Sequence, residues 1–238
     1  MKKIAYYPVI IAHRGIHDRF PENSLAAFDL ADREWVECDV WPAADGVPVV
    51  IHDETVDRTT TGKGIVWWQR LEQLRDLRLR HADGTVDENS RIPTLAELVD
   101  CPARLLVEIK QPDAPAFVRE VIRLLSMRGS RRNWMIQSFD EANLLHALAI
   151  DRTIPVALLV EDHEALARGF VHRWKNIYMR FDLLDELNIA ALRARGITIG
   201  VWTPTRSDEL QRAIGLRADV IITDDPLRAA SLLKTVDV

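Results

Sequence analysis

Acidic and histidine side chains stand at or near the ends of several short apolar runs in this sequence. The five most distinctive are His13, Glu37, Asp39, His52 and Glu108. A run of about four to six apolar residues is typical of a buried parallel strand, where an unpaired charge is costly. Charges in such places are seldom there for stability, so we expect these side chains to do chemistry.

The three carboxylates predict a metal site built from oxygen ligands. Without thiols, such a site suits Mg²⁺ or Ca²⁺ better than Zn²⁺. Three carboxylates and one divalent ion sum to about −1, and Arg14 and Lys110 would bring the site to about +1, which complements a phosphodiester monoanion. The two histidines suit general acid and base work, because an imidazole titrates near neutral pH. The chemistry predicted is cleavage of a phosphodiester.

Strands and helices alternate along the chain and must bring these residues together. Helix caps and turn residues separate eight apolar runs, which are 9–12, 35–40, 104–109, 134–138, 155–160, 176–179, 197–202 and 219–223. Eight such strands alternating with helices predict a distorted (β/α)8 TIM-type barrel, and the chain of 238 residues would form it as one domain, 1–238. Catalytic groups of these barrels lie at the carboxyl ends of the strands, where these residues stand.

A ninth apolar run, 47–53, follows the second strand after a short link that contains Asp45 and Gly46. A parallel crossover needs a dozen or more residues, so this run is expected to fold back as an antiparallel hairpin. A two-residue turn at Asp45 and Gly46 would place His52 directly across from Asp39. Nearby prolines weaken this register, and a bulge would displace it by one residue.

Several residues have a structural interpretation beside a functional one. We interpret Asn23 as a helix cap rather than a ligand, with Ser24 as the alternative cap. Arg58, which follows Asp57, could belong to the site or to a surface ion pair. Cys38 points to the face of its strand opposite its acidic neighbours, which favours packing over metal binding.

Composition excludes some function classes. The formal charge of −5 and the pI near 5.8 give no basic surface for nucleic acid or an anionic membrane. No apolar run is long enough to span a bilayer, and the stretch between Lys3 and His13 is too short for a secretory signal, so no stable membrane insertion is expected. Two cysteines are too few for a disulfide framework, which suits a cytoplasmic protein.

Eleven short motifs together resemble the glycerophosphodiester phosphodiesterase family. They are His13-Arg14-Gly15, Pro21-Glu22-Asn23, Glu37-Cys38-Asp39-Val40, Asp45-Gly46, His52-Asp53, Asp57-Arg58-Thr59-Thr60, Pro93-Thr94-Leu95, Glu108-Ile109-Lys110, Ser138-Phe139, Trp202-Thr203 and Thr223-Asp224. The likeness runs in order from residue 9 to residue 226, which is far more specific than any single motif.

The resemblance implies a barrel enzyme that uses a divalent cation, Mg²⁺ or Ca²⁺, to hydrolyse glycerophosphodiesters such as glycerophosphocholine to glycerol 3-phosphate and an alcohol. Matched residue by residue, it makes His13 and His52 the catalytic pair; Glu37, Asp39 and Glu108 the metal ligands; and Arg14 and Lys110 the phosphate-binding groups. It also places Glu22 near the metal and Trp202 at the glycerol end. The attacking group is either a hydroxyl of the substrate itself or water.

The segment 64–92 resembles the small insertion of this family, placed after the hairpin. It could contact the alcohol part of the substrate, although Trp67 and Trp68 within it are interpreted as packing residues. Two alternatives stay open. A related phosphodiesterase of the same superfamily that acts on lysophospholipids or phosphoinositides would use the same residues, and a barrel that only binds a phosphorylated ligand would share the fold. Oligomeric state and head-group preference do not follow from the sequence.

Overall fold

The computed structural model describes residues 7–31 and 34–236, so Lys2 and Lys3 lie outside the described residues. The chain divides into two compact units. The central unit spans Arg14–Val156. The terminal unit contains the chain up to His13 and the chain from Ala157 onward.

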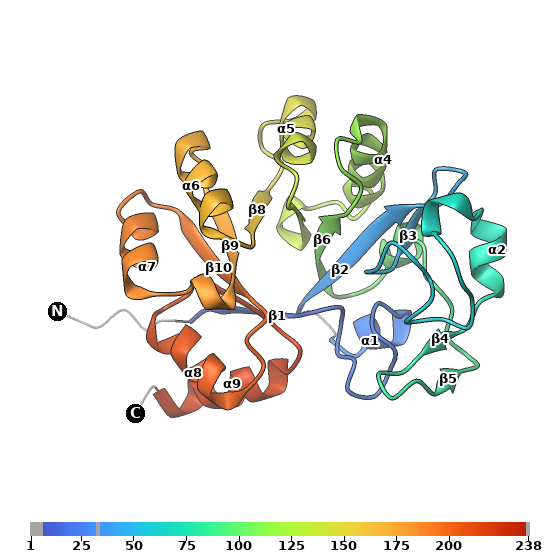
Figure 1. Ribbon diagram of the computed structural model, residues 1–238, viewed down its shortest axis with the longest axis horizontal. Coiled ribbons are helices and arrows are strands. Elements are labelled where there is room, and N and C mark those ends of the chain that lie inside the picture. Colours follow the sequence, from blue (N-terminus) through green and yellow to red (C-terminus); the bar gives the residue numbers. More distant parts are fainter. Residues whose placement is uncertain (1–6, 32–33, 237–238) are drawn as a thin grey trace. The chain divides into compact units, whose positions relative to one another are not determined.

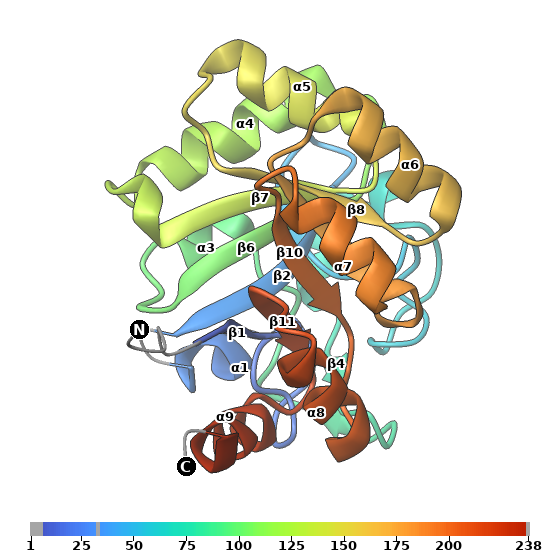
Figure 2. The same ribbon diagram turned by 90° about the vertical axis from the view of Figure 1, so that its left-hand side faces the viewer.

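The central unit contains a four-stranded sheet in the order β7-β6-β2-β3. Strands β7, β6 and β2 run parallel, and β3 pairs antiparallel with β2. In Figure 2, helices α4 and α5 lie side by side over β7. The elements are α1 (Leu25–Asp29), β2 (Trp35–Pro42), β3 (Pro48–Val50), α2 (Leu71–Asp76), β4 (Leu79–Arg80), β5 (Val86–Asp87), α3 (Leu95–Leu98), β6 (Arg104–Ile109), α4 (Pro115–Ser126), β7 (Trp134–Ser138) and α5 (Glu141–Ile150), with short 3₁₀ turns at Val66–Trp68 and Arg131–Asn133.

The terminal unit contains a parallel sheet in the order β8-β9-β10-β11-β1. Each strand from β8 on is followed by a helix, and α8 and α9 lie next to each other (Figures 1 and 2). The elements are β1 (Val9–Ala12), β8 (Val156–Val160), α6 (His163–His172), β9 (Asn176–Arg180), a 3₁₀ turn (Phe181–Leu183), α7 (Glu186–Arg193), β10 (Thr198–Trp202), α8 (Ser207–Gly215), β11 (Val220–Thr223) and α9 (Pro226–Val236). Among the described residues, no helix has the length and apolar character needed to cross a lipid bilayer.

The eight apolar runs predicted as strands are the eight parallel strands found in the described residues, with bounds that agree within two residues. Side chains of these strands are buried in the cores, and Leu105 and Val107 of β6 are fully buried. Cys38 of β2 is also fully buried, in agreement with its interpretation as a packing residue. A capping box opens α3: the Thr94 hydroxyl accepts a hydrogen bond from the Glu97 amide, and the Glu97 carboxylate accepts one from the Thr94 amide.

The predicted hairpin exists, but its predicted register is wrong by one residue. Val40 pairs with Val50, and the Ile51 amide donates to the Asp39 carbonyl, so His52 does not lie directly across from Asp39. The reason is the turn, which has three residues rather than two and closes with Gly46 at a φ of 80°. A three-residue hairpin loop of this kind needs a left-handed residue near its end, which glycine supplies.

The insertion 64–92 builds a small core of its own against the hairpin. Val66, Leu74, Leu79 and Ile92 are buried in one cluster with Ile51. Trp67 stacks on Trp41 with ring centroids 4.9 Å apart, which confirms its packing role. Trp68 is 74% exposed, so its interpretation as a packing residue is wrong. The insertion is thereby tied to the strand that follows the hairpin turn.

A tight turn follows His13 and determines where Arg14 points. Arg14 and Gly15 both have positive φ, at 55° and 84°. A Cβ on Gly15 would lie 2.9 Å from the Cβ of Ala27 in α1, and the Ile16 amide donates to the Ala27 carbonyl. Glycine is therefore required here for its backbone conformation and for the close approach to the helix.

Replacing Gly15 by alanine should destabilise the protein, because the variant combines a strained φ with a steric clash. We expect Gly15→Ala to lower the free energy of unfolding by about 2–4 kcal/mol in urea denaturation. Gly196 also has positive φ, but no atom lies within 4 Å of its added Cβ. Gly196→Ala should therefore lose only about 1–2 kcal/mol, and equal losses in the two variants would show that the contact with α1 does not matter.

Candidate active site

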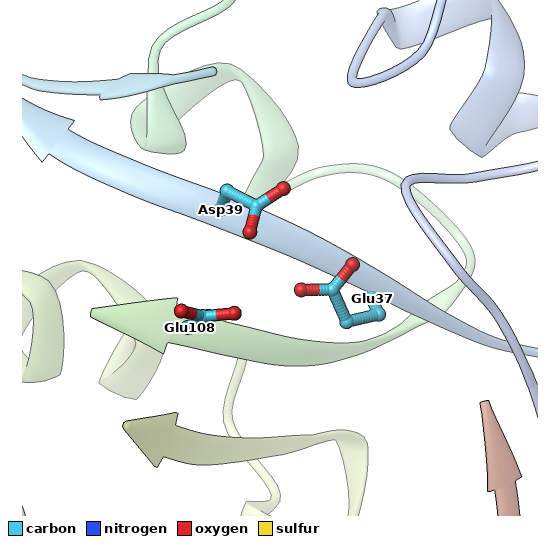
Figure 3. A group of neighbouring side chains, drawn as sticks. All are labelled: Glu37, Asp39 and Glu108. Atoms are coloured by element: carbon cyan, nitrogen blue, oxygen red, sulfur yellow. The ribbon is translucent and has the colours of Figure 1, made fainter. Parts of the chain in front are cut away.

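Three buried carboxylates meet between neighbouring strands of the central unit (Figure 3). Glu37 and Asp39 are two residues apart on β2 and so share a face, and Asp39 is the parallel partner of Glu108 on β6. One oxygen from each carboxylate lies within 4.8 Å of an oxygen from the others. The three residues are between 0% and 6% exposed. The sheet register thus assembles the metal ligands expected from the sequence.

Two cations compensate part of this buried negative charge. The Lys110 ammonium lies 2.7 Å from Glu108 Oε1 and 3.1 Å from Asp39 Oδ1. The Arg14 Nε lies 3.5 Å from Asp39 Oδ2. Among the described residues, no lysine or arginine forms an ion pair with Glu37, so one carboxylate charge of the three is left without a contacting positive group.

Neutral donors also form hydrogen bonds with oxygens of Glu37 and Asp39. The Arg14 amide donates to Glu37 Oε2 at 3.1 Å, and the Gln137 side-chain amide donates to Glu37 Oε1 at 3.3 Å. The Asn23 side-chain amide donates to Asp39 Oδ2 at 2.9 Å, and its oxygen accepts from the Asp39 backbone amide. The interpretation of Asn23 as a helix cap is wrong, since the Ser24 hydroxyl caps α1 and Asn23 instead orients an acidic residue of the site.

Burial and mutual repulsion change the protonation of the acids. Burial, together with the charges of Asp39 and Glu108, raises the pKa of Glu37 well above its usual range. Burial also raises the pKa of Glu108 to about 7, although Lys110 acts in the opposite direction. Burial would raise the pKa of Asp39 too, but Lys110, His52 and Arg14 outweigh it and keep that pKa below its ordinary value. Without a metal, the site relieves its excess negative charge by holding protons.

The cluster fits a divalent cation. Gln137 Oε1 is buried and accepts no hydrogen bond from the described residues. Two oxygens that bind one Ca²⁺ at about 2.3–2.6 Å lie at most about 5 Å apart. The oxygens of Glu37, Asp39 and Glu108 meet this limit, since they lie within 4.8 Å of one another. A divalent ion among these oxygens would offset the uncompensated carboxylate charge and replace the protons on Glu37 and Glu108.

Each of the two histidines named from the sequence is held by a carboxylate. In the central unit, His52 Nδ1 lies 2.7 Å from Asp53 Oδ1. In the terminal unit, His13 Nδ1 lies 2.7 Å from Asp224 Oδ1. Burial lowers the pKa of His52. A carboxylate at Nδ1 favours the tautomer with its proton on that nitrogen, which leaves Nε2 to exchange a proton with a ligand.

The other predicted site residues lie as follows. Glu22 accepts from Arg14 Nη1 at 3.0 Å and from both terminal nitrogens of Arg58, at 2.8 and 2.9 Å. Trp202, half-buried at the end of β10 in the terminal unit, donates from its indole nitrogen to the Tyr178 carbonyl at 3.1 Å. The central unit therefore contains every predicted site residue except His13 and Trp202.

Sequence reasoning gave no supporting role in the site to four residues: Asn23, Gln137, Asp53 and Asp224. Gln137 had a detectable signal, because it is a polar residue late in an apolar run and is the strand partner of Glu108. Asp53 also had one, since it directly follows His52 at the end of an apolar run. The Asn23 contact had none, because a local capping role explained that residue equally well.

Comparison with known proteins identifies relatives over nearly the whole length of the chain. The family model described as "Glycerophosphoryl diester phosphodiesterase family" matches residues 13–228. A glycerophosphodiester phosphodiesterase of Caldanaerobacter subterraneus is 31% identical over 240 residues, which cover 95% of this chain and 98% of that protein.

Solved structures share the fold. A structure from Silicibacter pomeroyi superposes with a TM-score of 0.87 at 21% identity and covers 97% of this chain and 94% of its own. An Oleispira antarctica phosphodiesterase, solved in complex with the product sn-glycerol-3-phosphate, superposes with a TM-score of 0.84 at 23% identity and covers 95% of this chain and 97% of its own. The likeness confirms the predicted (β/α)8 TIM-type barrel fold.

The raised pKa of Glu108 predicts how the stability of the metal-free protein depends on pH. The folded protein holds a proton on Glu108 up to a pKa of about 7, whereas the unfolded chain releases it near the ordinary value of 4.5. The folded state therefore binds more protons between these values, so stability falls as pH rises from 5 to 7. Thermal melts in a chelator should show the melting temperature falling across this window.

The Glu108→Gln variant supplies the control, because its neutral amide does not titrate. The slope between pH 5 and 7 should become shallower in this variant and also in the wild type with saturating Ca²⁺ or Mg²⁺. A melting temperature that rises with pH in the metal-free wild type would contradict the assignment of a raised pKa to Glu108.

Proposed function

Since the chain belongs to the glycerophosphoryl diester phosphodiesterase family, we propose that it hydrolyses glycerophosphodiesters, such as glycerophosphocholine, to sn-glycerol 3-phosphate and an alcohol. The chain is an enzyme, a phosphoric diester hydrolase. The observation that carries the substrate proposal is the cluster of three buried carboxylates with Arg14 and Lys110 beside it. Once a divalent cation is counted, this cluster has the charge that a phosphodiester monoanion complements.

Glu37, Asp39 and Glu108 would hold the cation, and their oxygen ligands suit Mg²⁺ or Ca²⁺. A cation bound there would supply Lewis-acid chemistry, which neutralises charge on the phosphoryl oxygens and acidifies the hydroxyl of the nucleophile. Gln137 Oε1, which is buried beside Glu37 and accepts no hydrogen bond from the described residues, supports this assignment. The raised pKa values of Glu37 and Glu108 support it as well.

Arg14 and Lys110 would bind the phosphate. Both lie against carboxylates of the cluster, with Lys110 2.7 Å from Glu108 and the Arg14 Nε 3.5 Å from Asp39. When a cation compensates the carboxylates, the electrostatic hold on these two side chains weakens and their N–H groups can turn to phosphoryl oxygens. The planar guanidinium of Arg14 suits a bidentate contact, and the Lys110 ammonium suits a single strong one.

His13 and His52 would act as the acid and the base. One Nε2 takes the proton from the attacking hydroxyl, which belongs either to the glycerol moiety or to water, and the other protonates the departing alkoxide as its P–O bond breaks. Attack by water gives glycerol 3-phosphate directly, whereas attack by the glycerol hydroxyl gives a cyclic phosphodiester that water must then open. The hydrogen-bonded carboxylates Asp224 and Asp53 support this role by orienting the two rings. In the sequence His13 directly precedes Arg14, whose amide donates to Glu37.

Two further residues complete the proposal. Glu22 would contribute to substrate binding by orienting Arg14, with which it forms a hydrogen bond. Trp202, half-buried at the end of β10, would pack against the glycerol moiety. The substrate is a small molecule, and the two buried, free cysteines fit an enzyme of the reducing cytoplasm.

The function is tested by the release of sn-glycerol 3-phosphate from glycerophosphocholine in Mg²⁺, in Ca²⁺ and in chelator. We expect release with at least one of the two metals and none in chelator, with recovery when metal is restored. A panel that adds glycerophosphoethanolamine, glycerophosphoglycerol and a lysophospholipid would rank the head groups. No release from any member with either metal would contradict the proposed function, and release only from the lysophospholipid would favour the lysophospholipase alternative.

Each histidine is tested by substitution. His13→Ala and His52→Ala should each lower kcat at least about 100-fold, because each removes an acid or base, while metal binding and the melting temperature stay close to wild type. His146→Ala is a matched control, since His146 also forms a carboxylate pair, with Asp113 at 2.9 Å, but on the exposed side of α5. Its kcat should be unchanged. Substantial turnover in either site variant would remove that histidine from the mechanism.

A further inference from the structure

One guanidinium group joins two carboxylates at the edge of the acidic site. Arg58 Nη1 and Nη2 donate to the two oxygens of Glu22 at 2.8 and 2.9 Å. Arg58 Nε and Nη2 donate to the two oxygens of Asp53 at 2.7 and 2.9 Å. Both contacts are bidentate, so the rigid fork of one arginine determines the orientation of two carboxylates at once. Arg58 is therefore not the partner of its neighbour Asp57 in a simple surface pair; Asp57 accepts from the Gly64 amide instead.

Each of these carboxylates leads to a residue that the proposed reaction uses. Asp53 Oδ1 lies 2.7 Å from His52 Nδ1, and Glu22 Oε1 accepts from Arg14 Nη1 at 3.0 Å. Arg58 thus lies in the middle of a continuous chain of hydrogen bonds that begins at the ring of His52 and ends at the guanidinium of Arg14. One end of that chain exchanges protons in the reaction, and the other binds phosphate.

The arrangement depends on the positive charge between the two acids. Without Arg58, the carboxylates of Glu22 and Asp53 would face each other with no cation between them and would repel each other. The hydrogen bonds from Arg58 are also the largest cause of the lowered pKa of Asp53, about 2, which keeps Asp53 ionised as the acceptor for His52. Lysine could not replace this group fully, because a single ammonium lacks the geometry for two bidentate contacts.

The backbone that carries Arg58 is held in place by neighbouring segments. The Thr60 hydroxyl donates to the Val56 carbonyl at 2.7 Å, and the Arg80 amide in the insertion donates to the Thr59 carbonyl at 2.8 Å. The Arg58 side chain is nevertheless 49% exposed. Ion pairs with so much solvent contact add little to folding stability, so this network is better explained by function than by stability.

We propose that Arg58 is a positioning residue of the hydrolysis: through Asp53 it sets the orientation of His52, and through Glu22 it sets that of Arg14. This role rests on the proposed function of the site. Arg58 does not touch the substrate, and its contribution appears in the rate of the chemical step.

Kinetics with glycerophosphocholine and saturating metal test the role of Arg58. Arg58→Ala should lower kcat about 10- to 100-fold, as is usual for residues that orient catalytic groups, with a melting temperature within about 3 °C of wild type. Arg58→Lys should recover only part of the loss. Arg123→Ala is the matched control, because Arg123 makes a bidentate pair with Glu120 and is 59% exposed on α4. Its kcat should equal that of the wild type.

A mutant cycle that removes both carboxylate partners separates positioning from a general structural effect. If Arg58 acts through Asp53 and Glu22, adding Arg58→Ala to the Asp53→Ala/Glu22→Ala variant should lower kcat little further. Losses that multiply would overturn the proposal, and so would a kcat of Arg58→Ala within twofold of wild type. If the wild type itself hydrolyses no substrate of the panel, the proposed function fails, and the role of Arg58 is then decided without turnover.

A measurement that needs no turnover is the tautomer of His52, observed in ¹H–¹⁵N spectra of the imidazole nitrogens at pH 8. The His52 signals are assigned by their disappearance in the His52→Gln variant. The wild type should carry its proton on Nδ1, and Arg58→Ala should add a population protonated on Nε2. An unchanged spectrum in Arg58→Ala would overturn the positioning role.

Discussion

The burial of three carboxylates within one small space is the constraint on which the rest of the active site depends. Such a cluster destabilises the folded protein unless its charge is compensated, and four neighbouring residues contribute to this compensation. Lys110 and Arg14 supply charge, while Asn23 and Gln137 supply amide donors. The carboxylate cluster keeps an excess of one negative charge, which makes it suited to bind a cation.

The fold supplies the close approach of the acids through strand register. Asp39 of β2, Glu108 of β6 and Gln137 of β7 are successive partners across three parallel strands, so their side chains form one row on one face of the sheet. Beside this row, the left-handed turn at Arg14 and Gly15 directs a backbone amide to Glu37. Strand register thus brings the three acids together, and the turn at Arg14 and Gly15 adds a backbone donor to Glu37.

Local signals in the sequence were sufficient to predict the strands and the cluster of Glu37, Asp39 and Glu108. Periodicity and capping are short-range properties, and the strand face of Glu37 and Asp39 follows from alternation alone. The hairpin register could not be predicted from local signals, because two-residue and three-residue turns both fit Asp45 and Gly46. A shift of one residue moves His52 out of the position directly across from Asp39. The partners of Arg58 were also hidden, since Glu22 is 36 positions away and the adjacent Asp57 offered a simpler pairing.

The central claim is that one divalent cation lies among Glu37, Asp39 and Glu108. Anomalous diffraction from crystals soaked in Mn²⁺, which accepts the oxygen ligands that suit Mg²⁺ and Ca²⁺, tests it most directly. The account predicts one anomalous peak within about 2.0–2.6 Å of an oxygen from each of the three carboxylates. An empty cluster, with Lys110 still against Glu108 while Mn²⁺ occupies other positions, would contradict it.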